Sequence, residues 1–352
     1  MTRGTPASVI RAATAAHRPP PGVELRAALD GLFTRAGVSR IVDLKTRPMP
    51  YASSYAIAEV DVRLADGRTV ELVCKDTGVA AMLAEARRIK PRFLYNPLRE
   101  IATYECILTP FGMGAPCFYG SAVDRQRGRY WLFLERVGVP ITEVGDFAVW
   151  QQACRWLARM HSRLALEPGL ARAIAQVPLV RYDRAHARSW MERAQENLDA
   201  DTSQPRLVRR RFASLALRYE RVLDELETQP SGFVHGEFFA SNVLVQTESG
   251  RPCVHPVDWE VAGIGPMLMD LAAFTAGWAE ERRVELADSY RTAISDEQGT
   301  SVPCDEFMRA LDCCRLQLAI QRVGWARQWT PPANHRQDWL NQAFDVADRL
   351  GF

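Results

Sequence analysis

The sequence lacks an excess of charge of either sign. It has 44 lysine and arginine residues and 42 acidic residues, which leaves a formal net charge of +2. The chain therefore has no general electrostatic attraction for nucleic acid or anionic lipid. It also lacks an uncharged apolar run of the roughly eighteen residues that a membrane-spanning helix needs. The best candidate, residues 263–279, is interrupted by Asp270. Neither nucleic acid nor a membrane is therefore an expected partner.

Targeting signals and cysteine motifs are missing as well. Residues 1–21 contain scattered arginines but no apolar core, so we expect no secretory signal there. The eight cysteines stand at irregular spacings, without a CxxC pair or a Cys/His cluster at zinc spacing. This pattern predicts reduced thiols in a cytoplasmic protein rather than a disulfide framework or a structural zinc site.

The rest of the composition is that of an ordinary globular protein. The chain has 352 residues, of which 47% are hydrophobic and 24% charged. This length suffices for one large or two modest domains with a sizeable core. The composition excludes the disordered, collagen-like and coiled-coil classes.

The first third of the chain has the pattern of a small sheet accompanied by helices. Apolar residues at helical spacing alternate with strand-like segments, and Asp66-Gly67 is typical of a hairpin turn. The expected elements are helices over 23–36 and 98–108 and strands over 56–64, 69–75, 119–123 and 130–135.

The remainder is mainly helical, with one strand-rich segment at 233–260. The change of pattern predicts two domains, residues 1–135 and 136–352, and an α+β fold class. Tryptophans 325, 329 and 339 belong either to the core or to a substrate pocket. The expected helices of the second domain lie over 146–161, 182–198, 206–226, 280–294, 305–325 and 336–350.

The segment 233–260 contains the residues most suited to chemistry. Two short apolar strands flank a turn at 248–250, and a hairpin brings its two ends together. Asn242 and Asp258 should therefore lie side by side, with Glu237 nearby. An amide oxygen and a carboxylate are hard ligands that suit Mg²⁺, and a second carboxylate can accept a proton from a hydroxyl group.

The spacing also matches a phosphoryl-transfer loop. The kinase catalytic loop reads H-x-D-x-x-x-x-N and is followed by a metal-binding Asp. Here His235 and Asn242 stand seven residues apart, and Asp258 ends the hairpin that follows. The combination favours a phosphotransferase.

These residues resemble the aminoglycoside phosphotransferase family, small-molecule kinases with a protein-kinase-like fold. The family pattern of His-Gly-Asp, Asn, Asp-Trp and Asp-Leu-Ala is matched here by His235-Gly236-Glu237, Asn242, Asp258-Trp259 and Asp270-Leu271-Ala272. The resemblance implies a two-lobed fold with a small antiparallel-sheet N-lobe and a helical C-lobe. It also implies that ATP and Mg²⁺ bind in the cleft between the lobes, and that His235 and Asp270 support the catalytic loop.

The resemblance assigns further nucleotide-binding residues to the N-lobe. Lys75 ends a strand and is one of three lysines in a chain rich in arginine, and a compact ammonium group suits a phosphate. Glu100 would pair with it, with Glu105 as second choice. The residues expected to contact phosphate or adenine are Ser53 and Ser54 in the loop before the first long strand, and Glu135, Arg136 and Val137 in the hinge.

The chain departs from the family at the catalytic acid, where Glu237 replaces Asp. The extra methylene moves the carboxylate, and a shift on the order of 1 Å can lower a rate about 10²-fold. The charge is unchanged, so Glu237 can still act as a general base. Glu260 is either a ligand of a second metal ion or a structural acid.

Three functions therefore stay open. The first is ATP- and Mg²⁺-dependent O-phosphotransfer to a hydroxyl group of a small molecule such as a metabolite, a sugar-like compound or an antibiotic. The second is a nucleotide-binding protein of the same fold with little or no transfer activity, which acts as a regulatory or binding module. The third is a protein kinase, which the absence of an Ala-Pro-Glu segment disfavours. The sequence favours the first.

Overall fold

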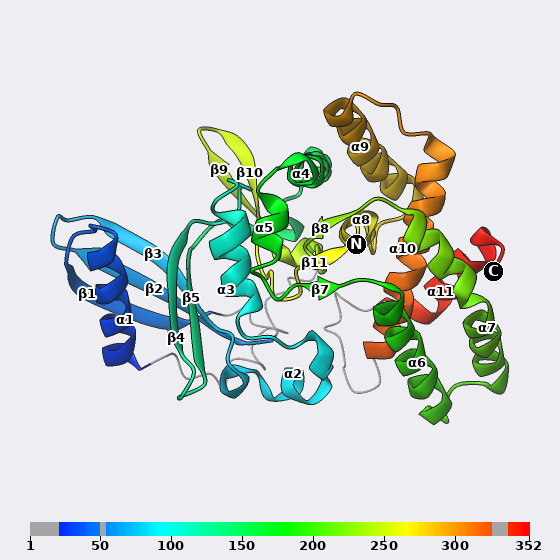
Figure 1. The fold of residues 1–352 in the computed structure, drawn as a ribbon, viewed down its shortest axis with the longest axis horizontal. Coiled ribbons are helices and arrows are strands. Elements are labelled where there is room, and N and C mark those ends of the chain that lie inside the picture. The colour runs from blue at the N-terminus through cyan, green and yellow to red at the C-terminus, as the bar shows by residue number, and fades with distance from the viewer. Residues whose placement is uncertain (1–20, 50–53, 326–336) are drawn as a thin grey trace, which may run out of the picture. The chain divides into compact units, whose positions relative to one another are not determined.

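The computed structural model describes residues 21–49, 54–325 and 337–352 (Figure 1). Ser53 and Trp329, both singled out above, lie outside these ranges. The chain divides into two compact units. The first comprises Met1–Pro110 and Ala115–Val137, and the second comprises Phe111–Gly114 and Gly138–Phe352.

The first unit is built on an antiparallel five-stranded sheet with the strand order β1-β2-β3-β5-β4. Strand β2 alternates between buried and less buried residues, as expected for a strand with one face toward a core. Leu25, Leu29 and Phe33 of helix α1 pack on that face against Val60 and other buried residues. The elements are α1 (Gly22–Arg35), β1 (Ile41–Pro48), β2 (Ala56–Leu64), β3 (Thr69–Asp76), β4 (Phe118–Asp124) and β5 (Arg129–Glu135).

Two helical segments connect β3 to β4. Helix α2 spans Ala84–Ile89 and α3 spans Arg99–Thr103, and α3 continues as a π-helical turn over Tyr104–Leu108. The sequence predicted a single helix over 98–108. The apolar pattern located the helical segment correctly, but it does not distinguish α from π winding, because both keep apolar residues on one side over so short a stretch.

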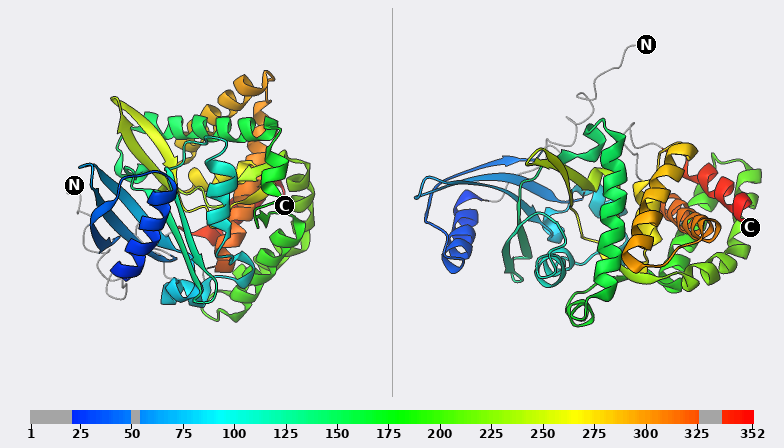
Figure 2. Two further views of the ribbon diagram at one scale, coloured as in Figure 1. Left: turned by 60° about the vertical axis from the view of Figure 1, so that its left-hand side comes forward. Right: turned by 90° about the horizontal axis from the view of Figure 1, so that it is seen from above.

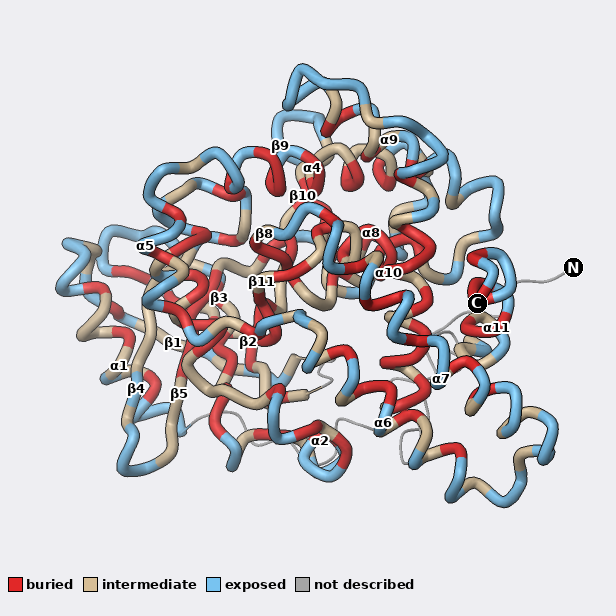
Figure 3. The backbone as a smooth tube through the Cα atoms, turned by 45° about the vertical axis from the view of Figure 1, so that its right-hand side comes forward, coloured by how far each residue is buried: buried red, intermediate tan, exposed pale blue. Residues whose placement is uncertain are grey.

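The second unit is mainly helical, and α10 is its central helix (Figure 2). Helix α10 packs against α6, α7, α8 and α11, and half of its residues are buried (Figure 3). Within the described ranges, no helix is both long enough and apolar enough to cross a membrane. The helices are α4 (Phe147–Leu166), α5 (Leu170–Ile174), α6 (Arg184–Ala200), α7 (Arg206–Thr228), α8 (Leu268–Phe274), α9 (Glu280–Gln298), α10 (Cys304–Trp325) and α11 (Trp339–Leu350).

Two small three-stranded sheets complete the second unit. In one, β8 (Ser231–Val234) pairs antiparallel with β11 (Gly263–Pro266), and β7 (Val180–Arg181) pairs parallel with β11. In the other, β9 (Val243–Glu248) forms the predicted hairpin with β10 (Arg251–Pro256), and β6 (Val139–Pro140) pairs with β9. The loop 235–242 therefore leaves one small sheet and enters the other.

Helix α7 allows a matched test of its buried face. Leu215 is 2% exposed and Leu217 is 86% exposed, so the two leucines differ in burial but not in type or helix. We expect Leu215→Ala to reduce the free energy of unfolding by about 2–5 kcal/mol and Leu217→Ala to change it by less than about 0.5 kcal/mol. Thermal and chemical unfolding of both variants measures the difference, and equal losses would contradict the assigned face.

Candidate active site

Lys75 and Glu100 form a buried ion pair in the first unit. Lys75 Nζ lies 2.6 Å from Glu100 Oε2, and the side chains are 7% and 1% exposed. Strand β3 supplies the lysine and α3 the glutamate, whereas Glu105 lies on the π-helical turn and is exposed. Lys75 Nζ also lies 5.5 Å from the centre of the Tyr55 ring. The structure thus pairs Lys75 with the first-choice acid.

The hinge residues are held by the sheet to different degrees. The Arg136 main-chain N–H donates to Glu71 O at 3.1 Å, and the guanidinium contacts Glu59, Asp61 and Glu71. Arg136 therefore cross-links the strands β2 and β3. The main-chain N–H of Glu135 donates to Cys117 O at 2.9 Å.

The catalytic-loop segment is anchored by Asp270. The main-chain N–H groups of His235 and Gly236 donate to its two carboxylate oxygens at 2.7 and 2.9 Å, and Asp270 is fully buried. Helix α8 carries Asp270, and the sequence did not predict that helix. The expected partnership of His235 with Asp270 is present, but it runs through the backbone of His235.

The two buried histidines support the same loop. His235 Nε2 lies 2.9 Å from Val257 O and its Nδ1 accepts from Glu237 N at 3.3 Å, which assigns the proton of the neutral ring to Nε2. His161 Nε2 lies 3.4 Å from Asp270 Oδ2, and its Nδ1 lies 2.8 Å from the Tyr290 hydroxyl. A hydrogen-bonded chain therefore runs from Tyr290 through His161 and Asp270 to the loop.

Gly236 fits only because it has no side chain. Its φ is +85°, and a Cβ atom there would lie 2.2 Å from the Tyr182 hydroxyl and 2.5 Å from Val261 O. The Tyr182 hydroxyl donates to Val261 O at 2.6 Å, so the tyrosine cannot move aside without losing that bond.

Asn242 and Asp258 are brought together as the hairpin predicted. Val257 N donates to Asn242 O at 2.9 Å, which places Asp258 one residue from this bond. Asn242 Nδ2 donates to Glu237 O at 3.0 Å, so the amide ties the two ends of the loop together. Asp258 has a φ of +67°, a conformation that among the described non-glycine residues only Ser249 shares. Strained backbone of this kind is concentrated at functional sites.

The donor set at this position fits a hard cation. Asn242 and Asp258 supply oxygen ligands, and the chemistry of amide and carboxylate oxygens suits Mg²⁺. Over the described parts of the chain, no group of three His, Cys, Asp or Glu side chains is placed to hold a metal by itself. A cation would therefore complete its shell with phosphate oxygens and water. Glu260 is 5% exposed and follows the fully buried Trp259, whose ring lies 4.3 Å from that of His235.

Arg322 is a site residue that the sequence interpretation missed. Its Nη2 lies 3.5 Å from Glu237 Oε1, and its guanidinium lies 4.2 Å from the centre of the Phe239 ring. Burial lowers the pKa of the Arg322 guanidinium, while the charge of Glu237 opposes this shift. A single charged residue in the otherwise uncharged stretch 316–325 of α10 was the available signal, but it did not identify a partner so distant in sequence.

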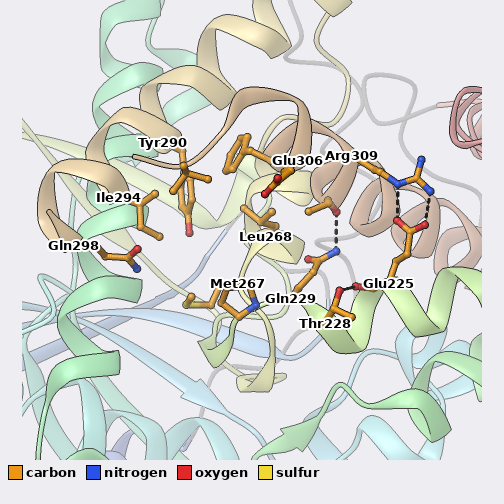
Figure 4. Close-up of a pocket in the computed structure, with 14 residues that line it drawn as sticks. Glu225, Thr228, Gln229, Met267, Leu268, Tyr290, Ile294, Gln298, Glu306 and Arg309 are labelled. Carbon is orange, nitrogen blue, oxygen red and sulfur yellow. Dashed lines mark hydrogen bonds and ion pairs between the residues drawn. The ribbon is translucent and has the colours of Figure 1, made fainter. Parts of the chain in front are cut away.

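The second unit also contains a pocket among its helices (Figure 4). A pocket of about 460 Å³ is lined by segments of α7, α8, α9 and α10, including Met267, Leu268, Tyr290 and Phe307. None of the predicted site residues lines it. Its connection to the loop is Tyr290, whose hydroxyl contacts His161.

Comparisons with known proteins identify similar sequences and similar folds. The model of the phosphotransferase enzyme family matches residues 108–310. Viomycin phosphotransferase from Streptomyces vinaceus is 43% identical over 68 residues, which is 18% of this chain and 24% of that protein. The chain therefore spans about a quarter of this curated relative.

Solved structures show the same fold at low identity. Wild-type aminoglycoside 2'-phosphotransferase-IIIa, as its GDP complex, is 14% identical with a TM-score of 0.55, and 92% of this chain covers 97% of that one. Choline kinase from Cryptosporidium parvum is 11% identical with a TM-score of 0.58, at 87% and 88% coverage. These likenesses confirm the predicted α+β, kinase-like fold.

The anchoring role of Asp270 predicts a large loss on a nearly isosteric change. In Asp270→Asn one carboxylate oxygen becomes an NH₂ group that faces a backbone or imidazole donor, so we expect the free energy of unfolding to fall by about 3 kcal/mol. Hydrogen exchange at the amides of His235 and Gly236 should accelerate. Asp296→Asn, at an exposed position of α9, is the control, and equal stability of the two variants would contradict the anchor.

His186 predicts a specific pH dependence of stability. It accepts a hydrogen bond from Trp190 Nε1 at 3.0 Å, and burial lowers the pKa of His186 from 6.5 to about 4. The unfolded chain therefore binds this proton more readily, and stability is lost as the pH falls from about 6.5 toward 4. In His186→Gln the melting temperature should decline less over that range. Parallel pH profiles for both proteins would show the assignment to be wrong.

Proposed function

Because the chain belongs to the phosphotransferase enzyme family, we propose that it transfers the γ-phosphoryl group of ATP to a hydroxyl group of a small molecule in a Mg²⁺-dependent reaction. The observation that carries the proposal is the closed loop that unites Glu237, Asn242 and Asp258. Two hydrogen bonds, from Asn242 Nδ2 to Glu237 O and from Val257 N to Asn242 O, close it.

Each residue of the loop has a role suited to its chemistry. Glu237 accepts the proton of the acceptor hydroxyl, whose oxygen bonds to the γ-phosphorus as the bond from that phosphorus to the β–γ bridging oxygen breaks. Asn242 and Asp258 hold Mg²⁺, which supplies neutralisation of the phosphate charge, and Glu260 is a candidate ligand for a second ion. His235 and Asp270 keep the loop in shape.

The first unit supplies the residues proposed for the nucleotide. Glu100 holds the Lys75 ammonium group at 2.6 Å, and this compact charge is suited to a phosphate. The backbone of Glu135 and Val137 pairs with the base. Ser54 is a candidate phosphate contact, and its carbonyl oxygen accepts from Leu83 N at 3.0 Å.

The charge distribution bears on the acceptor. A polycationic aminoglycoside would need a group of unpaired acids in the second unit. Glu280, at the start of α9, contacts Arg283, Arg315 and Arg349 at 2.8, 3.7 and 3.2 Å. Asp201 accepts hydrogen bonds from Ser203. Because these acids are engaged, we propose a hydroxylated small molecule as the acceptor without extending the family name to its identity.

A second candidate function rests on Glu237. Its longer side chain lies beside Arg322, so a protein that binds ATP without transferring phosphate is the alternative. Incubation with Mg·ATP and a panel of hydroxylated metabolites, sugars and antibiotics distinguishes the two. A product heavier by one phosphoryl group supports transfer. Thermal stabilisation by Mg·ATP with no product on any acceptor supports the binding protein.

Substitution of Lys75 tests the proposed nucleotide-binding role most directly. Lys75→Met removes the ammonium group from a buried site, and we expect kcat/KM to fall by about 10²–10³-fold, the scale for losing one charge-stabilising donor. Lys45→Met, at an exposed position of β1, should leave kcat/KM unchanged. Both are measured by product formation at varied ATP. Equal kcat/KM for the two variants would exclude the proposed role of Lys75.

A further inference from the structure

Hydrogen bonds within the loop fix the main chain of Glu237, but they do not set the orientation of its side chain. Glu237 N donates to His235 Nδ1 at 3.3 Å, and Glu237 O accepts from Phe239 N at 2.7 Å and from Asn242 Nδ2 at 3.0 Å. These bonds fix the Cα position. The glutamate side chain still has three rotatable bonds, one more than aspartate, so a longer base is less defined unless something holds its carboxylate.

Arg322 is placed to supply that constraint. Its Nη2 lies 3.5 Å from Glu237 Oε1, and the two side chains are only 12% and 19% exposed. The guanidinium also lies 4.2 Å from the centre of the Phe239 ring, in the same loop. Because α10 is buried among its neighbours, the arginine projects from a rigid support.

The burial of the Arg322 guanidinium indicates that its contact with Glu237 has a specific role. Removing a guanidinium from water is unfavourable unless an anion compensates, and Glu237 is the charge that opposes the lowering of the Arg322 pKa by burial. Among the residues that the structure describes, Arg322 Nε is buried and has no hydrogen-bond partner. An apolar side chain would fill this position of α10 more stably, so the arginine is explained by what it does to Glu237.

We infer that Arg322 is a positioning residue that holds one carboxylate oxygen of Glu237, so that the other oxygen faces the acceptor hydroxyl. The inference rests on the proposed function and accounts for the glutamate. Shortening the side chain by one methylene, about 1.5 Å, would move the carboxylate beyond ion-pair distance of a guanidinium that is now 3.5 Å away. Glu237 and Arg322 therefore act as a unit. Arg322 takes no part in the bond changes.

The experiment is a double-mutant cycle with Arg322→Gln, Glu237→Asp and the double variant. Turnover is measured with Mg·ATP and the acceptor found in the screen, and separately as phosphate release from Mg·ATP to water. We expect Arg322→Gln to lower kcat about 10²-fold, the effect of a misplacement on the order of 1 Å, with KM for ATP unchanged. The double variant should be no slower than Glu237→Asp alone, because the interaction is already lost.

Two further variants separate positioning from folding. Arg315→Gln removes an arginine of equal exposure, 12%, from the same helix, where it pairs with Asp312 at 2.6 Å. It should lower the melting temperature without changing kcat. Arg322→Lys keeps the charge but lacks the planar fork, so its kcat should fall between those of the native chain and Arg322→Gln. If Arg322→Gln does not fold, Arg322→Lys is compared in the native and Glu237→Asp backgrounds.

The outcomes are distinct. An active native chain whose kcat is unchanged in Arg322→Gln, or a cycle in which the two losses multiply, overturns the positioning role and leaves the proposed function intact. A native chain that transfers phosphate neither to any acceptor nor to water overturns the proposed function and, with it, this inference.

Discussion

The site depends on the buried carboxylate of Asp270. It accepts the backbone N–H groups of His235 and Gly236 and lies within reach of His161 Nε2, so one fully buried side chain satisfies several donors that no sheet ladder pairs. A buried acid without such donors would be strongly unfavourable. The backbone N–H groups of the loop and the Asp270 carboxylate therefore stabilise each other when both are buried. The loop adopts the path that makes these hydrogen bonds. This path sets the backbone from which the side chains proposed to act, Glu237 and Asn242, project.

The close contact at Gly236 follows from the same constraint. With both N–H groups directed to Asp270, the chain must turn through a left-handed conformation next to the Tyr182 hydroxyl. Any larger residue would break either the Asp270 bonds or the bond from Tyr182 to Val261 O. The next residue is Glu237, so its main chain is set by its neighbours and only its side chain is left to be positioned. Arg322 of α10 contacts that side chain.

The sequence predicted what local patterns encode. Strand β2 was located to the residue because β-alternation runs through it, and the adjacency of Asn242 and Asp258 followed because a hairpin has only one way to close. Helix α8 was missed because it is short, follows the strand β11 closely, and is mostly apolar, so it shows no amphipathic periodicity. The contact of Arg322 with Glu237 joins two elements far apart in the chain, and no local pattern reports such a pairing. The buried state of Lys75 was indicated only by its position at the end of an apolar strand.

The use of lysine and arginine in the two units suggests a division of tasks. Arg136 contacts three acids from two strands, and Arg322 contacts a carboxylate and an aromatic ring. In both cases the planar fork joins protein groups to one another. Lys75 instead presents a compact point charge to Glu100. Among the three lysines of the chain, Lys75 is buried and paired with an acid, which is compatible with the proposed phosphate contact. In the proposed mechanism Arg322 likewise orients Glu237 and leaves proton transfer to that carboxylate.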